Sequence, residues 1–306
     1  MKSIRTIQIA ALAAIAAMGL AACGSGSADT ATSPNASASS QTDDISVNVA
    51  VDEKASALVP QSVKDKGTLT VAMELKYPPT SFIAEDGKTP IGLNVDMARL
   101  IAKKLGLQLE IADVGFDTII PALQGNRYDM TVTSMSATAE RVAVVDMIDY
   151  FKAGSSVAVA KGNPDGYAVD NLCGRQVVVM KGSIQATKRL PELSKSQCED
   201  QGKPAITGII LPSIQDAMTQ LASGRIKAIY YDTPSLGWAA TQQPNRFEVL
   251  TPQVNESVVA VALPKGSELT PAVQAAIQSI VPSPEYQEWL QRWGLDGLGV
   301  TEAKLH

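Results

Sequence analysis

Histidine is almost absent from this chain, because the only one is His306. A Ser-His-Asp or Cys-His catalytic arrangement requires an imidazole inside the fold, and a multi-histidine metal centre requires several. The sequence therefore argues against most hydrolases and metalloenzymes. We expect a protein that is not an enzyme and that carries neither a metal ion nor a cofactor.

Basic residues are also few, since 26 Lys and Arg residues face 31 Asp and Glu residues and give a formal net charge of −5. Nucleic-acid binding draws its affinity from basic patches, so nucleic acid is not an expected partner. After residue 20, no apolar run approaches the roughly 20 residues of a membrane-spanning helix. The composition, 45% hydrophobic and 19% charged over 306 residues, is ordinary for a globular protein with room for two lobes.

The beginning of the chain reads as a targeting segment. A basic start precedes an apolar run over 7–20, which is too short and too rich in alanine for a permanent span. Residues 20–24 read Leu-Ala-Ala-Cys-Gly, which resembles the lipobox of bacterial lipoproteins. This resemblance implies a signal peptide over 1–22 and a palmitate-type lipid anchor on Cys23. The alternative is an ordinary secretory signal cut nearby.

Large apolar residues are missing from the next stretch, 24–44, which is rich in Ser, Ala, Thr and Gly. Such a segment cannot bury a core, so it predicts a flexible tether. We expect the lipid anchor and tether to occupy residues 23–59, with ordered structure beginning near Pro60.

Cysteine is scarce, with three residues in all. If Cys23 is lipidated, Cys173 and Cys198 are the only pair that remains. In an oxidising compartment we expect them to form a disulfide that closes a loop of about 24 residues, for which chain entropy predicts roughly 3 kcal/mol of stabilisation. The alternative is two buried free thiols.

Beyond Pro60 the chain alternates strand and helix patterns. In the first unit, strands are expected at 69–75, 107–111 and 128–133, and helices at 94–105, with Asn94 as its cap, and at 116–123. In the second unit, strands are expected at 176–180, 209–211 and 226–231, separated by helices. The chain then returns to the first unit with a strand at 258–262 and helices at 271–280 and 284–293. This order predicts α/β units built on parallel sheets.

One stretch, Ser134–Arg141, combines small hydroxyl residues after a strand with an arginine one turn into a helix. Backbone amides, hydroxyls and a guanidinium fork together suit a carboxylate ligand. In isolation, the simpler interpretation is a helix capped by Thr138, with Arg141 paired to Glu140 or Asp146 on its surface.

Two later segments have a similar ambiguity. Residues 181–185 place Lys-Gly-Ser-Ile-Gln between a strand and a helix, which is either an anion site or an ordinary connection. Asp232 ends a strand, so it either faces the carboxyl edge of a sheet or only caps the helix beginning at Pro234.

Six segments in order, behind a lipobox, resemble the bacterial extracellular solute-binding proteins of family 3, the polar amino-acid receptors of ABC importers. They are Tyr77-Pro78-Pro79, 92–96, 116–123, 134–141, 181–185 and 231–234. The resemblance implies a two-lobed periplasmic-binding-protein fold (Venus flytrap), in which two parallel-type α/β lobes are joined by a two-strand hinge. Residues 60–154 plus 256–306 would form lobe 1, and 155–255 would form lobe 2.

The resemblance also implies roles for single residues. Arg141 would bind a ligand α-carboxylate, and Asp232 would take the α-ammonium. Glu74 would meet either that ammonium or a cationic side chain. Thr80 departs from the family, which often has an aromatic residue there, and Phe82 is a potential substitute. The implied ligand-binding residues are Glu74, Tyr77, Phe116, Ser134, Ser136, Arg141, Ser183, Ile184, Gln185 and Asp232.

The expected function is therefore that of a lipid-anchored, extracytoplasmic receptor that delivers a polar amino acid to an ABC importer. Its expected partners are the ligand and the permease subunits, and we expect a monomer that meets the membrane only through its lipid. Two alternatives remain, a dehydratase-like enzyme on the same fold and a sensor ectodomain that acts through a membrane partner. The lack of an internal histidine disfavours the enzyme.

Overall fold

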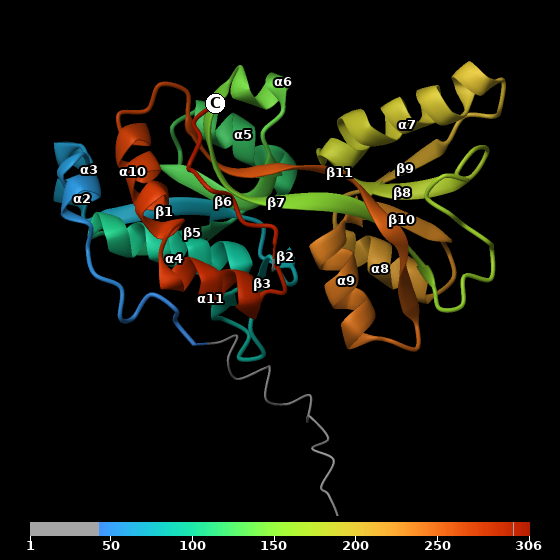
Figure 1. Ribbon diagram of the computed structural model, residues 1–306, viewed down its shortest axis with the longest axis horizontal. Helices are drawn as coiled ribbons and strands as arrows, with labels where there is room; N and C mark the ends of the chain where they lie inside the picture. The colour runs from blue at the N-terminus through green and yellow to red at the C-terminus, as the bar shows by residue number, and fades with distance from the viewer. Residues whose placement is uncertain (1–42, 296) are drawn as a thin grey trace, which may run out of the picture.

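The computed structural model describes residues 43–295 and 297–306 (Figure 1). Within them an eight-stranded sheet has the order β5-β1-β6-β11-β7-β10-β8-β9. Its strands are β1 (Thr68–Met73), β5 (Gln108–Asp113), β6 (Met130–Ser136), β7 (Val145–Ala160), β8 (Gln176–Met180), β9 (Thr207–Leu211), β10 (Ala228–Asp232) and β11 (Phe247–Pro264). A smaller sheet contains β2 (Lys76–Tyr77), β3 (Ser81–Ile83) and β4 (Pro90–Ile91).

Helices cover both faces of the large sheet, as Figure 1 shows. In the first lobe they are α2 (Glu53–Ala57), α3 (Gln61–Lys66), α4 (Leu93–Leu105), α5 (Phe116–Gln124), α6 (Ala139–Val142), α10 (Thr270–Ile280) and α11 (Pro284–Arg292). In the second lobe they are α7 (Leu190–Gln197), α8 (Ile214–Ala222) and α9 (Thr233–Gln242). Gly106 ends α4 in the left-handed conformation (φ 72°), as its sequence position predicts.

The first lobe is built on parallel pairs of β1 with β5 and with β6. Because side chains alternate along a strand, Val71 packs into the core with α4, α10 and α11, while Ala72 faces the core beneath α5. Both residues are fully buried. The lobe therefore has a hydrophobic layer on each face of its sheet.

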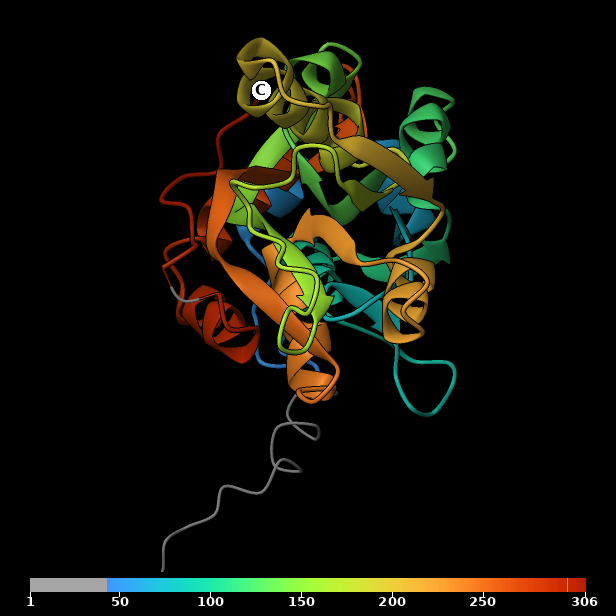
Figure 2. The ribbon, with the colours of Figure 1, turned by 90° about the vertical axis from the view of Figure 1, so that its right-hand side faces the viewer.

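The second lobe follows the same plan. Strand β8 pairs in parallel with β9 and β10, and α7 lies on one face while α8 and α9 lie on the other. Figure 2, seen from the second lobe's side, shows this separation of α7 from α8 and α9.

Two long antiparallel strands, β7 and β11, pass from one lobe to the other (Figure 1). Their register shifts between Leu250 and Val254, between Val254 and Ser257, and again between Val259 and Ala260. Irregular pairing of this kind bends and twists a strand pair, so the two lobes meet at an angle around this crossing.

The predicted tether is wrong for residues 43–59, the described part of the range 23–59. Asp52 caps α2 by accepting hydrogen bonds from the backbone amides of Lys54 and Ala55. Val47, Val51 and Leu58 of this segment are exposed. Four other apolar residues are buried in the core of the first lobe, and their burial offsets the entropy of ordering a short segment. They are Ile45, Val49, Ala55 and Val59.

The predicted signal peptide over 1–22 and lipid anchor on Cys23 lie outside the described residues. Within the part of the chain that the structure describes, no helix is both long enough and apolar enough to cross a membrane.

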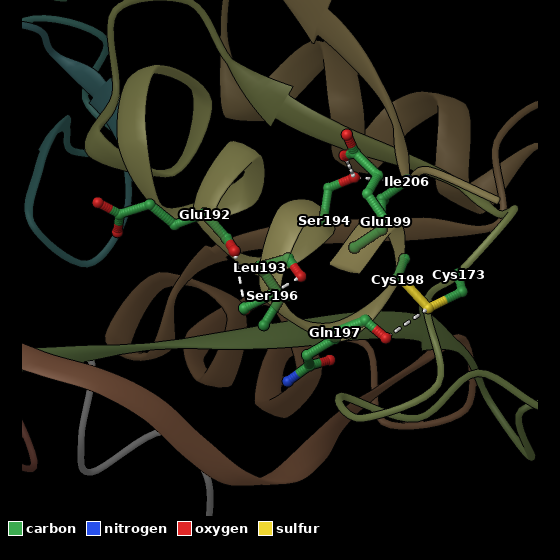
Figure 3. Close-up of a disulfide and its surroundings, with 9 residues drawn as sticks. All are labelled: Cys173, Glu192, Leu193, Ser194, Ser196, Gln197, Cys198, Glu199 and Ile206. Carbon is green, nitrogen blue, oxygen red and sulfur yellow. Dashed lines mark hydrogen bonds between the residues drawn. A yellow bond between two sulfur atoms is a disulfide. The ribbon is translucent and has the colours of Figure 1, made fainter. Parts of the chain in front are cut away.

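The predicted disulfide between Cys173 and Cys198 is confirmed (Figure 3). It joins the end of α7 to the loop before β8, and Cys198 is fully buried. Nearby, the Ser194 hydroxyl donates to the Glu199 carboxylate (2.7 Å) and accepts from the Ile206 amide (3.0 Å), as Figure 3 shows. These bonds and the disulfide attach one end of α7 to its sheet.

Candidate functional site

A pocket lies between the two lobes, where β6 and β10 end and the turn after β8 approaches α5. The space left in it is about 10 Å³, enough for one water molecule. It is lined by Phe116, Ser134, Ser136, Arg141, Ser183, Ile184, Gln185, Tyr231 and Asp232. All the predicted ligand-binding residues except Glu74 and Tyr77 therefore line one pocket.

Arg141 points its guanidinium into this pocket. Thr138 caps α6 and accepts a hydrogen bond from the Arg141 amide (3.4 Å), which fixes the direction of the helix. One guanidinium nitrogen donates to the Ser136 carbonyl (3.0 Å), and the other donates to the Gly182 carbonyl of the second lobe (3.0 Å). Burial lowers the pKa of Arg141 to about 10, so it stays cationic at neutral pH.

The surface interpretation of Arg141 is therefore wrong. Its guanidinium bonds to carbonyl groups and lies 5.6 Å from the centre of the Phe116 ring. Asp146, one of its expected surface partners, instead accepts from Gly266 and Thr270.

Asp232 approaches the pocket from the second lobe. Its carboxylate accepts hydrogen bonds from the Gln185 amide (2.7 Å) and the Tyr77 hydroxyl (3.4 Å), and it makes no capping bond to α9. Desolvation raises the pKa of Asp232 to about 6, while the bond from Gln185 and the charges of Arg189 and Arg141 oppose that rise. Asp232 is therefore a pocket carboxylate that neighbouring donors help to keep ionised.

Ser134 is held in an uncommon backbone conformation. Its φ is 52°, in the left-handed region that side chains rarely adopt, and such strain gathers at functional sites. The Tyr150 hydroxyl accepts from the Ser134 amide (3.2 Å), while the Asn94 side-chain oxygen accepts from Ser134 Oγ (3.1 Å) and from Tyr150 (2.6 Å). These bonds fix the turn that aims Ser134 and Ser136 at the pocket.

The predicted role of Asn94 as a helix cap is wrong. Gly92 occupies the cap position of α4, and Asn94 lies buried in the first turn, where it supports Ser134. Its contact with Ser134 spans 40 residues, so no local pattern could reveal it.

The segment 181–185 supplies the wall of the second lobe. Lys181 pairs with Asp117 of the first lobe at 2.6 Å. A Cβ atom at Gly182 (φ 74°) would lie 3.2 Å from the Asp117 Cβ, so only glycine fits this close approach of the lobes comfortably. The Ser183 hydroxyl accepts from the Ala186 amide (3.2 Å) and caps the turn.

Glu74 and Tyr77 lie behind the pocket wall. Tyr77 packs edge-on against Tyr231, with ring centres 5.2 Å apart. Glu74 is 9% exposed, and its pKa is raised to about 7, chiefly by desolvation and also by the charges of Asp113 and Asp117. A hydrogen bond from the Phe116 amide and the charge of Lys76 oppose this rise.

Tyr231 is a lining residue to which no sequence argument gave a role. It belongs to the segment 231–234 and is buried at the end of β10, next to Asp232 in the chain. Among the described residues, no group of three or more His, Cys, Asp or Glu side chains is arranged to hold a metal ion.

Two α/β lobes joined by crossing strands, with opposite charges facing the pocket between them, define the class of two-lobed small-molecule-binding proteins. A profile of the bacterial extracellular solute-binding proteins, family 3, matches residues 69–296. The chain belongs to this family, and the predicted two-lobed fold is confirmed.

Three known proteins illustrate the similarity. The arginine-binding protein ArgT of Corynebacterium glutamicum is 31% identical over 240 residues, which are 78% of this chain and 78% of that protein. An ancestral arginine-binding protein bound to arginine is 31% identical, with a TM-score of 0.67 over 74% of this chain and 98% of that one. The ancestral amino acid-binding protein AncCDT-1, a precursor of cyclohexadienyl dehydratase, is 25% identical, with a TM-score of 0.67 over 78% of this chain and 99% of that one.

Proposed function

We propose that this protein captures an amino acid with a cationic side chain, arginine above all, between its lobes and delivers it to an ABC importer. The observation that carries this proposal is the approach of Arg141 and Asp232 from different lobes to one pocket. An amino acid has the complementary pair of charges, and each charge must be satisfied once water is expelled.

The α-carboxylate of the ligand would bind the Arg141 fork. At present the fork donates to two neutral carbonyl oxygens, of Ser136 and Gly182. Hydrogen bonds between two ionised groups are roughly twice as strong as neutral ones, so a carboxylate is a better acceptor for both nitrogens. The α-ammonium would bind Asp232, with the hydroxyls of Ser134 and Ser136 beside it.

Glu74 gives the proposed site its preference for a cationic side chain. Its carboxyl is buried close to two other acids, Asp113 and Asp117, which together disfavour its charged form. A ligand cation would lower the pKa of Glu74 and relieve this repulsion, and the Phe116 ring would add cation–π attraction. The names of ArgT and of the arginine-bound ancestral protein agree with this preference.

Capture would couple to closure of the lobes, which we place at residues 60–154 plus 256–306 and at residues 155–255. Residues 43–59 pack with the first of these. Neither lobe alone offers both charges, so the ligand binds the closed form better than the open one. A shift of the closed-to-open ratio from about 1:99 to 99:1 requires the ligand to bind the closed form more tightly by roughly 5.5 kcal/mol.

The proposed location of the protein rests on the lipobox-like residues 20–24. A lipid on Cys23, after removal of residues 1–22, would hold a monomeric receptor at the extracytoplasmic face of the membrane. There the loaded receptor would meet the permease subunits of the importer.

A thermal-shift screen of the mature protein against arginine, lysine, histidine, glutamine, glutamate and cystine tests this function. A ligand present at 100 times its Kd adds about 2.7 kcal/mol of stability. We expect arginine to raise the melting temperature most. If no amino acid raises it, the proposed function is wrong.

A dehydratase-like enzyme is the second candidate, because Glu74, with a pKa near 7, suits general acid–base chemistry. The similarity to a dehydratase precursor supports it as well. Recovering the ligand after prolonged incubation and analysing it by mass spectrometry separates the two functions. A receptor returns the ligand unchanged, and a dehydratase returns a product lighter by one water.

A further inference from the structure

Arg189 is a buried cation to which the proposed site gives no role. It is 6% exposed, and its guanidinium bonds to two neutral hydroxyls. One nitrogen donates to Ser155 Oγ (2.6 Å) and the other to Ser257 Oγ (2.6 Å). Ser155 lies in β7 and Ser257 in β11, so one side chain joins the two strands that connect the lobes. Burying a charge is costly, which makes a purely incidental position improbable.

Through Ser155, Arg189 is connected by hydrogen bonds to Asp232, the acid of the pocket. Ser155 is the residue opposite Asp232 in the pairing of β7 with β10. The Gln185 side-chain amide donates both to Ser155 Oγ (2.8 Å) and to the Asp232 carboxylate (2.7 Å). Arg189, Gln185 and Asp232 therefore share one hydrogen-bonded network.

The contact with Ser257 leads to the arginine of the pocket. The Ser257 hydroxyl donates to Ser136 Oγ (3.4 Å), and the Ser136 carbonyl accepts from Arg141 (3.0 Å). The guanidinium of Arg189 thus contacts one hydroxyl on the path to each charged group of the pocket.

The local helix geometry places Arg189 for this role. Residues Gln185–Arg189 form a π-helical stretch before α7, and both of its end residues are buried. Such wide turns are rare and are often found at functional sites, because they redirect side chains that a regular helix would point elsewhere. Here Gln185 and Arg189 both turn inward to the crossing strands.

We propose that Arg189 is a positioning residue for amino-acid capture, which fixes the crossing of the two strands and keeps the Asp232 carboxylate charged and oriented for the ligand ammonium. The inference rests on the proposed function. Of the two cations that lower the pKa of Asp232, Arg189 already has the larger effect. When a ligand carboxylate occupies Arg141, it offsets the charge of that guanidinium, and Asp232 then depends on Arg189 still more. A lysine has one point charge in place of a planar fork, so it cannot join both serines in the same way.

The electrostatic part of this role depends on all the groups around Asp232. Arg189 and Arg141 lower its pKa, together with the bond from Gln185, against the desolvation that raises it to about 6. The phenols nearby are neutral at physiological pH, because burial raises their pKa values. They are Tyr150, Tyr230 and Tyr231; the Tyr77 hydroxyl also donates to Asp232.

Calorimetric titration of L-arginine into the mature protein between pH 5 and pH 8.5 tests the inference. The whole series carries Glu74→Gln, and in the comparisons below wild type means this parent, because Glu74, with a pKa of about 7, would otherwise add its own loss of affinity at acid pH. The variants are Arg189→Met, which keeps the stem and removes the charge, and Arg189→Lys, which keeps the charge and removes the fork. Lys195→Met is the matched control, because it removes the same charge from an exposed side chain on α7. We expect the control to bind like the wild type.

In Arg189→Met we expect affinity at pH 7.5 to fall at least tenfold. The loss of affinity toward acid pH should begin at a higher pH than in the wild type, because removing a nearby cation raises the pKa of Asp232. In Arg189→Lys we expect weaker binding, but affinity should begin to fall toward acid pH near the same pH as in the wild type. Ser257→Ala breaks one bond to Arg189 and keeps its charge, so it should weaken binding severalfold without changing the pH at which affinity begins to fall. This variant replaces Arg189→Met in the test if Arg189→Met fails to fold.

The role of Arg189 is overturned, while the proposed function stands, if Arg189→Met binds with wild-type affinity. It is also overturned if the affinity of Arg189→Met begins to fall toward acid pH at the same pH as that of the wild type. If Arg189→Met does not fold, wild-type affinity in Arg189→Lys and Ser257→Ala overturns it. Failure of the wild-type protein to bind any amino acid overturns the proposed function itself.

Discussion

Arg141 is the residue on which recognition of an amino acid depends most directly in this site. We expect Arg141→Ala to keep the fold, because the side chain bonds only to two carbonyls at the pocket and its helix is capped by Thr138. Truncating one partner of a buried ion pair costs roughly 2–5 kcal/mol, so arginine affinity should fall at least about 30-fold. Calorimetry measures the affinity and circular dichroism the fold.

Arg127→Ala is the matched control for this prediction. Arg127 also belongs to the first lobe and lies over an aromatic ring, that of Tyr128, but it does not line the pocket. We expect it to bind like the wild type. Unchanged affinity in Arg141→Ala would show that the ligand carboxylate binds elsewhere.

Glu74 makes arginine binding dependent on pH around neutrality. Its pKa is raised to about 7, chiefly by desolvation, so below pH 7 the carboxyl is mostly neutral and attracts a cation weakly. Arginine affinity should therefore rise as the pH increases through 7, and binding near pH 7 should release protons. Titrations in two buffers of different ionisation enthalpy measure this release.

Glu74→Gln should remove that proton release and weaken arginine binding more than tenfold at pH 8, with a smaller effect on glutamine.

The same substitution should affect the stability of the ligand-free protein. Between pH 4.5 and pH 7 the unfolded carboxyl ionises while the folded one keeps its proton, so the wild type loses stability as the pH rises through this window. Glu74→Gln should lose less than the wild type there, because other buried acids such as Asp232 keep their own contribution, and chemical denaturation of both proteins at pH 5 and pH 8 measures the difference.

Among the secondary-structure elements, α7 depends on the Cys173–Cys198 disulfide. The bridge closes a loop with a sequence separation of 25, which corresponds to about 3 kcal/mol of chain entropy. Replacing both cysteines by serine should lower the melting temperature by roughly 6–12 °C, given 2–4 °C per kcal/mol for a protein of this size. Arginine affinity should change less than threefold, because the bridge lies at the end of α7 away from Arg189.

The same element separates what local sequence predicts from what it misses. The stretch from Ser134 to Arg141 was predictable only in part. The Thr138 cap is local, but the stretch alone favoured a surface position for Arg141, whose bond to Gly182 spans 41 residues. The role of Arg189 was not predictable, because its bond to Ser257 spans 68 residues and becomes visible only when the two crossing strands are placed side by side. The role of Asn94 was not predictable for the same reason, since its bond to Ser134 spans 40 residues, while Gly92 takes the cap position of α4 without a side-chain bond.

The N-terminal boundary of the first lobe is not evident from composition. The Ser- and Ala-rich stretch ends before Ile45, and apolar residues then recur at Val49 and Val59. Averaging over the whole range hid these few side chains, which pack into the first lobe. The order of strands and helices, by contrast, follows from repeated local patterns, which predicted α/β units. The two-lobed arrangement was predicted from the resemblance to the family.

For the whole molecule, closure of the lobes depends on contacts that never touch the ligand. Phe82 in β3 lies beside Trp238 in α9, with ring centres 6.2 Å apart, so this pair joins the first lobe to the second. The sequence suggested Phe82 as a ligand contact in place of Thr80, but the pocket lining does not include it. Phe82 therefore bears on the balance between open and closed forms and leaves the choice of ligand to other residues.

Phe82→Ala tests this assignment. An aromatic pair contributes about 0.5–1.5 kcal/mol beyond its burial, so affinity should fall about 2- to 13-fold, mainly through faster dissociation from a less stable closed form. Because every ligand requires the same closure, arginine, lysine and glutamine should weaken by a common factor in stopped-flow and calorimetric measurements. A direct ligand contact would weaken the three unequally. That result would return Phe82 to the binding site and leave the coupling between lobes to the crossing strands and to contacts such as that of Lys181 with Asp117.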